Sequence, residues 1–164
     1  MDRRTFNSLL AVSLGTAICT AVAAPAAQGD CTAALQAGGL TEADFRNYIA
    51  AFNRNDFEGF GRFYAEDVIF EGRAGKFGRR ADVLSFYRDV KSRVRETLTL
   101  QDIVIGTDDI IADLETELYA LEDWPDFPTG PIRKGQTIRS RNFIWYDVRD
   151  RQFVRVRSAH YRST

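Results

Sequence analysis

Histidine and cysteine are scarce in this 164-residue chain, which holds one histidine and two cysteines. Only Cys31 lies beyond the N-terminal apolar run, so the folded part has no intramolecular disulfide and its stability must come from packing. A zinc site is disfavoured because zinc needs several such ligands. The 22 basic and 23 acidic residues nearly balance, which argues against a nucleic-acid or anionic-membrane partner.

Sequence motifs for nucleotide and nucleophile chemistry are absent as well. The chain has no nucleophile elbow, no phosphate-binding loop and no dinucleotide fingerprint, since its glycine-rich stretch from Gly72 to Gly78 lacks the required lysine and glycine spacing. Ser158 has no neighbouring acid that would complete a catalytic triad. Hydride and phosphoryl transfer are therefore disfavoured, and we expect no cofactor.

Residues 1–27 resemble a cleaved export signal. Arg3 and Arg4 precede an uncharged, alanine-rich run from Leu9 to Ala27, and Phe6 places a large apolar side chain where twin-arginine signals have one. An ordinary secretory signal, or a start-codon error with a short membrane anchor, stays open as an alternative. We expect the mature protein to be exported, to the periplasm or out of the cell.

The remaining residues amount to one domain. A hydrophobic content of 45% with 12% aromatic residues is enough to fill a core, and no later apolar stretch is long enough to span a bilayer. We assign residues 28–40 to a linker and residues 41–164 to the globular domain. There are no internal repeats.

Hydrophobic periodicity predicts two helices, a strand, a third helix and then four more strands. Phe45, Tyr48, Ile49 and Phe52 recur with helical spacing after Thr41, which can cap the helix. A short second helix buries its apolar side over residues 57–64, and a third begins near residue 80 and continues to about residue 94. Two-residue alternation predicts a first strand at residues 68–71 and four more near residues 98–105, 110–121, 136–146 and 152–161. The sequence therefore predicts an α+β fold.

Charged residues alternate along the later strands and define one face of the predicted sheet. Acidic residues at 113, 115 and 117 would face arginines at 139, 141, 155 and 157 in neighbouring strands. Such a ladder of ion pairs is favoured over a metal site, because hard cations need more oxygen ligands in a tighter cluster. The opposite face is an apolar wall with few polar groups, as expected for a small-molecule cavity.

The opening of the domain has a distinctive set of residues, namely Tyr48 to Asn53, Asp56, Phe60 and Tyr64 to Glu71. In these residues it resembles SnoaL-like and ketosteroid-isomerase-like proteins of the nuclear transport factor 2-like superfamily. The resemblance implies three N-terminal helices packed on a strongly curved, mainly antiparallel sheet that forms a conical pocket. It also implies a homodimer through the outer face of the sheet.

The same resemblance suggests site residues, although the isomerase chemistry is not carried over intact. Tyr48 matches the family's oxyanion-hole tyrosine, and Asn142 corresponds to its second oxyanion acid. The general-base position falls on Gly72, with Glu71 one residue away and on the other face. His160, the only histidine, lies on the predicted inner face and carries a side chain that can act as acid or base, so we take it as the substitute base.

These residues also have simpler interpretations, because His160 can be a hydrogen-bonded structural residue and Tyr48 a core aromatic. The segment from Trp124 to Pro128 is either an ordinary hairpin connection or a lid over the pocket mouth. The predicted pocket lining, apart from the three catalytic candidates, is Phe52, Val68, Phe70, Leu114, Leu118, Ile144, Val156 and Ser158.

Two functional hypotheses follow for a small apolar or carbonyl-bearing ligand. The first is an exported, cofactor-independent enzyme of the cyclase, isomerase or dehydratase type, with His160 as acid or base and with Tyr48 and Asn142 polarising the substrate. The second is a non-catalytic binding protein of the same fold, in which these residues only orient a ligand. A third hypothesis is an interaction module whose pocket is filled by its own side chains.

Overall fold

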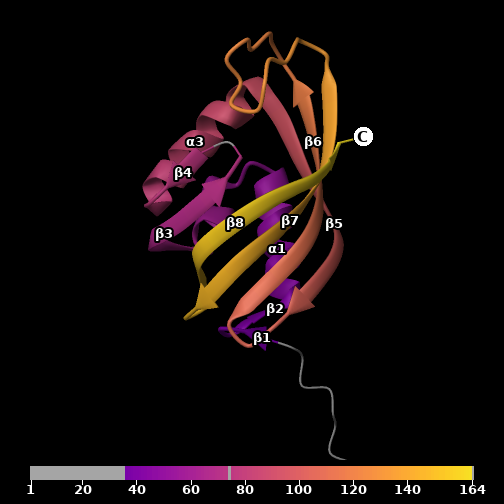
Figure 1. The fold of residues 1–164 in the computed structure, drawn as a ribbon. Coiled ribbons are helices and arrows are strands. Elements are labelled where there is room, and N and C mark those ends of the chain that lie inside the picture. The colour runs from indigo at the N-terminus through magenta and orange to yellow at the C-terminus, as the bar shows by residue number, and fades with distance from the viewer. Residues whose placement is uncertain (1–35, 74, 164) are drawn as a thin grey trace, which may run out of the picture. The chain divides into compact units, whose positions relative to one another are not determined.

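The computed structural model describes residues 36–73 and 75–163 (Figure 1). The predicted export signal, Cys31 and most of the predicted linker lie outside these residues. The end of that linker forms two short paired strands, β1 (Gln36–Ala37) and β2 (Leu40–Thr41), which the sequence pattern did not predict. Within the described ranges, no helix is long and apolar enough to cross a membrane.

Three helices form as predicted: α1 (Glu42–Asn53), α2 (Phe57–Gly61) and α3 (Arg80–Arg93). Thr41 caps α1 through a capping box, in which its hydroxyl accepts from the Asp44 backbone N–H while the Asp44 carboxylate accepts from the Thr41 N–H. Helix α2 is shorter than predicted, because Tyr64 already belongs to the next strand. The four longest strands of the sheet follow α3, as the pattern indicated.

Six strands make one mixed, mostly antiparallel sheet in the order β4-β3-β8-β7-β6-β5. Strands β3 and β8 are parallel to each other, and the other neighbours are antiparallel. This confirms the α+β class, while strong curvature and a conical shape stay predictions. The strands are β3 (Tyr64–Gly72), β4 (Gly75–Phe77), β5 (Val94–Ile105), β6 (Asp109–Ala120), β7 (Thr137–Arg149) and β8 (Gln152–Ser163).

The sequence-based prediction missed strand β4 and placed the start of β5 too late, in each case for a physical reason. The stretch expected to be only a glycine-rich turn contains β4, which pairs Phe77 with Phe70 of β3 and brings the two rings to 6.1 Å. Strand β5 begins at Val94 instead of Leu98, because Val94 is fully buried and pairs with Ala120 of β6. Tertiary packing overrides the helical period at this residue.

The core lies between the helices and one face of the sheet, which we call the inner face. Figure 1 shows α1 running behind the strands on this side. Aromatic side chains dominate the core and contact one another mainly edge to face, as Tyr48 and Phe153 do at 5.1 Å. The largest fully buried side chains are Tyr64, Tyr146, Phe45, Phe52, Phe60 and Phe153.

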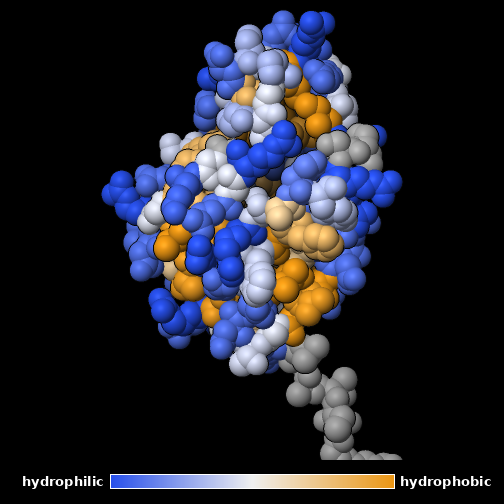
Figure 2. All heavy atoms as spheres, in the orientation of Figure 1, coloured by the Kyte–Doolittle hydropathy of each residue, from blue (hydrophilic) through white to orange (hydrophobic). Residues whose placement is uncertain are grey.

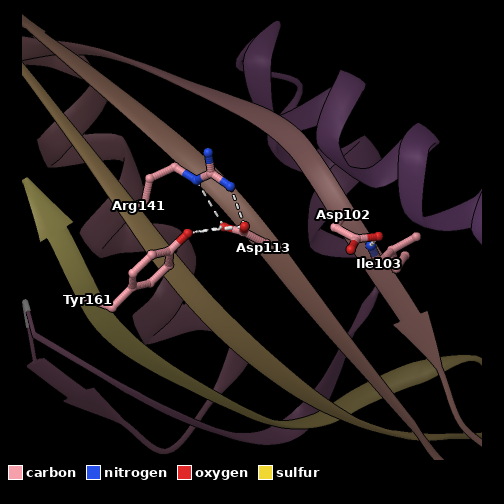
Figure 3. Close-up of polar contacts among 5 residues, drawn as sticks. All are labelled: Asp102, Ile103, Asp113, Arg141 and Tyr161. Atoms are coloured by element: carbon pink, nitrogen blue, oxygen red, sulfur yellow. Dashed lines mark hydrogen bonds and ion pairs between the residues drawn. The ribbon is translucent and has the colours of Figure 1, made fainter. Parts of the chain in front are cut away.

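The outer face of the sheet carries the predicted ion pairs, with one correction. Arg139 pairs with Glu117 across β7 and β6. Arg141 and Tyr161 both bind Asp113, with the Tyr161 hydroxyl 3.0 Å from Asp113 Oδ1 (Figure 3). The arginines of β8 do not reach the acids of β6, because β7 lies between these strands. They bind acids of their own neighbours instead: Arg155 binds Glu71 of β3, and Arg157 binds Asp147 of β7.

Candidate functional site

A cavity of about 170 Å³ lies against the inner face of the sheet. Its walls come from α1, α3, β3 and the strands β5 to β8, together with the loop 121–136 between β6 and β7. An apolar cavity of similar size holds a benzene-sized molecule. The lining is mainly aromatic and aliphatic, and includes Phe70, Phe86, Tyr87, Leu98, Leu118, Phe127, Ile144, Tyr146 and Val156.

Buried tyrosine hydroxyls gather beside the inner end of this cavity. The Tyr48 hydroxyl is 2.7 Å from that of Tyr64, and the Tyr48 side chain is 3% exposed. Burial raises the pKa of Tyr48, Tyr64, Tyr87 and Tyr146 well above the ordinary value for a phenol. These groups therefore stay protonated near neutral pH and can act as hydrogen-bond donors.

Three neighbouring polar side chains, those of Thr116, Ser140 and Asn142, form a row on the inner face. Asn142 Nδ2 donates to Thr116 Oγ1 at 3.3 Å and to Ser140 Oγ at 3.2 Å. Both amide protons are thus directed to the wall, while each hydroxyl accepts one of them and keeps its own proton to donate. Within this row, the donors available to a ligand oxygen are therefore the hydroxyls of Thr116 and Ser140, and Asn142 orients them.

His160 lines the cavity at its solvent-exposed mouth, directly across the β7–β8 pair from Asn142. Exposed Arg73 also lines this cavity, and its Nη2 donates to the Thr129 carbonyl oxygen at 3.3 Å. Thr129 belongs to the loop 121–136, whose Phe127 forms part of the cavity wall. The sequence left the segment from Trp124 to Pro128 as either a hairpin connection or a lid. The aromatic side chains of this segment are buried, since Trp124 is 8% exposed and Phe127 is 7% exposed.

The position where the resemblance expects a general base is occupied by Gly72, which faces the cavity. A Cβ atom at this position would lie 2.7 Å from Ser158 Oγ, so Ser158 fills the space that a side chain would need. Glu71 points to the outer face, where hydrogen bonds from Lys76 and Arg155 lower its pKa to about 2. Glu71 is therefore an ion-paired carboxylate outside the cavity.

Sequence reasoning missed the carboxyl group that does line the cavity, Glu96 of β5. Burial raises the pKa of Glu96 to about 7, although the positive charge of Lys91 opposes this change. A signal was available in the sequence, because Glu96 alternates in phase with the inward-facing Val94 and Leu98. An acidic residue on the apolar face of a strand is unusual enough to mark a candidate site.

The structure brings most of the predicted site residues together. Those that line the cavity are Tyr48, Phe70, Leu118, Asn142, Ile144, Val156, Ser158 and His160. Phe52, Val68 and Leu114 are not in the cavity lining and belong to the hydrophobic core. In the part of the chain that the structure describes, no group of three or more His, Cys, Asp or Glu side chains could hold a metal ion.

Comparisons with known proteins agree with this architecture. The SnoaL-like domain family matches residues 45–156. A candidate polyketide cyclase from Xanthomonas campestris pv. campestris has 28% identity and a TM-score of 0.59, over 71% of this chain and 86% of that one. Among curated proteins, no relative was found.

Two further solved structures share the fold. A candidate polyketide cyclase from Pseudomonas putida has 24% identity and a TM-score of 0.61, over 72% of this chain and 89% of that one. A candidate ketosteroid isomerase from Kribbella flavida has 20% identity and a TM-score of 0.54, over 74% of this chain and 78% of that one. With most of the domain matched by the family and its fold shared with these structures, the chain belongs to the SnoaL-like family of the nuclear transport factor 2-like superfamily.

Proposed function

We propose that this protein catalyses cofactor-independent proton transfer on a small, mainly apolar, carbonyl-bearing ligand, in a reaction of the cyclase, isomerase or dehydratase type. The observation that carries the proposal is the cavity itself. It combines apolar walls with hydrogen-bond donors and with groups that can exchange a proton, Glu96 and His160. A few directed polar groups in an apolar pocket are typical of sites that bind and orient small molecules.

The chemical roles follow from what each group offers. The hydroxyls of Thr116, Ser140 and Tyr48 can donate to a ligand carbonyl oxygen and stabilise the enolate that forms when a neighbouring C–H loses its proton. His160 at the mouth can exchange a proton with solvent and with the polar end of the ligand. Asn142 holds two of the donor hydroxyls in place.

An exchange experiment tests this function without knowledge of the natural substrate. Cyclohexanone and acetophenone fit the size and chemistry of the cavity, and exchange of their α-protons in D₂O can be followed by proton NMR. We expect exchange to be faster with the wild-type protein than with an Ile144→Trp variant, in which the larger side chain blocks the cavity. The exposed variant Ser92→Ala is the matched control. Equal exchange rates for wild type and Ile144→Trp contradict a catalytic cavity.

A non-catalytic binding protein is the second candidate, because Asn142 and Tyr48 already hydrogen-bond within the wall. In that case the ketones bind, as seen in ligand-observed NMR, and the Ile144→Trp substitution abolishes binding, yet their α-protons exchange at the uncatalysed rate. Substitution His160→Ala separates the two candidates further. It lowers the exchange rate if His160 transfers protons and changes only affinity in a binding protein.

We propose in addition that the protein is a homodimer through the outer face of the sheet. Phe143, Trp145 and Tyr161 are each more than 40% exposed there, and Phe143 stacks on Tyr161 with ring centroids 4.6 Å apart. On this side of the sheet, Figure 2 shows patches of apolar residues among charged ones. Aromatic residues framed by paired charges suit a protein interface.

We also propose export, to the periplasm or out of the cell. The support is the N-terminal sequence, in which Arg3 and Arg4 precede the alanine-rich run from Leu9 to Ala27. Fractionation of cells that express the full chain tests it. A full-length product that stays in the cytoplasm contradicts export.

A further inference from the structure

Lys91 is buried directly behind the cavity wall, in the last turn of α3, and is 9% exposed. Its Nζ donates to the carbonyl oxygen of Phe52 at 3.0 Å and to that of Glu96 at 3.3 Å. The same atom lies 3.7 Å from the centroid of the Phe52 ring. Two carbonyl groups and one aromatic face therefore surround the three N–H donors of the ammonium group.

This arrangement ties three elements together at one point. Phe52 lies in the last turn of α1, Lys91 in the last turn of α3 and Glu96 near the start of β5. A buried lysine is costly unless it is well hydrogen-bonded, and this one binds backbone atoms and no carboxylate. Its contacts fix the backbone from which the Glu96 side chain enters the cavity.

The Glu96 carboxyl group has different surroundings. Within the described ranges, no hydrogen bond or ion pair joins it to another residue, although the side chain lines the cavity. The titratable groups that act on it are the phenols of Tyr48, Tyr64 and Tyr87, which stay neutral, and the Lys91 ammonium group. Lys91 is thus the charged group that favours ionisation of Glu96.

We propose that Glu96 is the proton-accepting group of the cavity, and that Lys91 is its positioning residue, which holds the start of β5 against α1 and places its positive charge next to the Glu96 backbone, behind the wall. This inference rests on the proposed function, since it names the residue that performs the proton transfer. It places the base on β5, whereas the sequence resemblance expected one at Gly72 on β3.

The balance between burial and the Lys91 charge suits a base that works near neutral pH. Burial raises the pKa of Glu96 to about 7, and it lowers the pKa of Lys91 to about 8. A carboxylate that gains a proton near pH 7 is a stronger base than an exposed one and is still ionised in a large share of molecules. His160 is exposed at the mouth, whereas the Glu96 side chain is partly buried in the cavity wall.

Carbon-13 NMR titration tests the coupling without any ligand. The side-chain carboxyl resonance of Glu96, assigned by its absence in Glu96→Gln, is followed against pH in the wild type, in Lys91→Met and in the exposed control Lys134→Met. We expect the midpoint to rise by about one pH unit or more in Lys91→Met, because an opposite charge nearby is lost. The midpoint should stay unchanged in Lys134→Met.

The reciprocal measurement covers the case in which Lys91→Met does not fold. In Glu96→Gln the midpoint of the Lys91 ε-carbon resonance should fall by the same amount, because the coupling between two sites is reciprocal. An unchanged Glu96 midpoint in folded Lys91→Met, or an unchanged Lys91 midpoint in Glu96→Gln, overturns the positioning role of Lys91.

A chromogenic probe, 5-nitrobenzisoxazole, tests Glu96 as the base. The Glu96 carboxylate would take the proton from the isoxazole C–H, the C–H electron pair would complete the nitrile, and the N–O bond would break to release a coloured phenolate. We expect cleavage to fall by about 100-fold or more in Glu96→Gln. The pH midpoint of cleavage should match the Glu96 midpoint from NMR and move with it in Lys91→Met.

The outcomes separate this inference from the function on which it rests. A wild-type rate no higher than that of Glu96→Gln overturns the assignment of Glu96. If cleavage is instead lost in His160→Ala and kept in Glu96→Gln, His160 is the base, and the inference fails while the proposed function stands. Failure of the ketones to exchange or bind, with the probe cleaved through Glu96, overturns the proposed ligand class and leaves the Glu96 assignment intact.

Discussion

Replacing Glu96 with glutamine is expected to remove a pH dependence of folding stability that the wild type shows between pH 4.5 and 7. The substitution keeps the size of the side chain and removes its charge. In the folded protein the pKa of Glu96 is about 7, against 4.5 for an ordinary glutamate. Between these values the unfolded chain has lost the proton while the folded protein still holds it.

The direction and size of the effect follow from proton linkage. Because the folded state binds more protons in this interval, its free energy of unfolding falls as the pH rises. Each pH unit of displacement corresponds to about 1.4 kcal/mol, so the carboxyl group lowers stability by up to about 3 kcal/mol at pH 7. Water that enters the cavity reduces this figure, and we expect about 1 to 3 kcal/mol.

Urea denaturation of both proteins at a series of pH values from 4.5 to 7.5 measures the effect. The difference in unfolding free energy between Glu96→Gln and the wild type should grow with pH over this range. Both proteins share all other carboxyl groups, so the contributions of these groups to the pH dependence cancel in the difference. Glu71, with a pKa of about 2, titrates well below the interval. Lys91, with a pKa of about 8 in the wild type and a lower one in Glu96→Gln, begins to lose its proton towards the upper end of the series and adds to the difference in the same direction. The rise below pH 6.5 is therefore the diagnostic part of the series. A difference that is independent of pH refutes the assignment of a raised pKa to Glu96.

Three further experiments, with four substitutions, test other parts of the structure. Tyr64→Phe removes the partner of the Tyr48 hydroxyl and should cost about 1 kcal/mol of stability by urea denaturation, whereas no loss argues against this hydrogen bond. Phe143→Asp places a charge on the outer face and should give a monomer by analytical ultracentrifugation; a wild-type monomer contradicts the proposed dimer. Gly72→Ala should be destabilising alone and less so combined with Ser158→Ala, which removes the clashing hydroxyl. Equal costs in both backgrounds contradict the contact.

The sequence predicted the fold class because its periodic signals are strong and local. The spacing of Phe45, Tyr48 and Phe52 and the capping pair of Thr41 and Asp44 specify α1 without help from tertiary contacts. Alternation along β6 and β7 likewise indicated the pairing of acids with arginines, and the ion pair between Arg139 and Glu117 forms.

Boundaries and short strands were harder to predict because distant residues decide them. Strand β4 is stabilised by pairing with β3, and β1 by pairing with β2, and neither has a pattern of its own. Val94 has the spacing of a helical residue but enters a strand because Ala120 is its partner. Arg155 was assigned to the wrong acids, since strand order in the sheet cannot be read from alternation alone.

The candidate site was predicted only in part, and the reason lies in the two-residue period of strands. The resemblance directed attention to the end of β3, where Glu71 and Gly72 differ by one residue and therefore by one face. The acidic residue faces outward there, into ion pairs, and glycine faces the cavity.

A cavity enclosed by several strands can receive the same functional group from more than one of them. Strand β5 has the acidic residue in the inward phase, at Glu96, and α3 supplies Lys91 behind it. The fold thus determines which positions of each strand face the cavity. It does not determine which of these strands carries the carboxyl group. In this chain, the acidic residue in phase with the apolar face of β5 lines the cavity, whereas the acidic residue next to the motif position on β3 lies in ion pairs outside it.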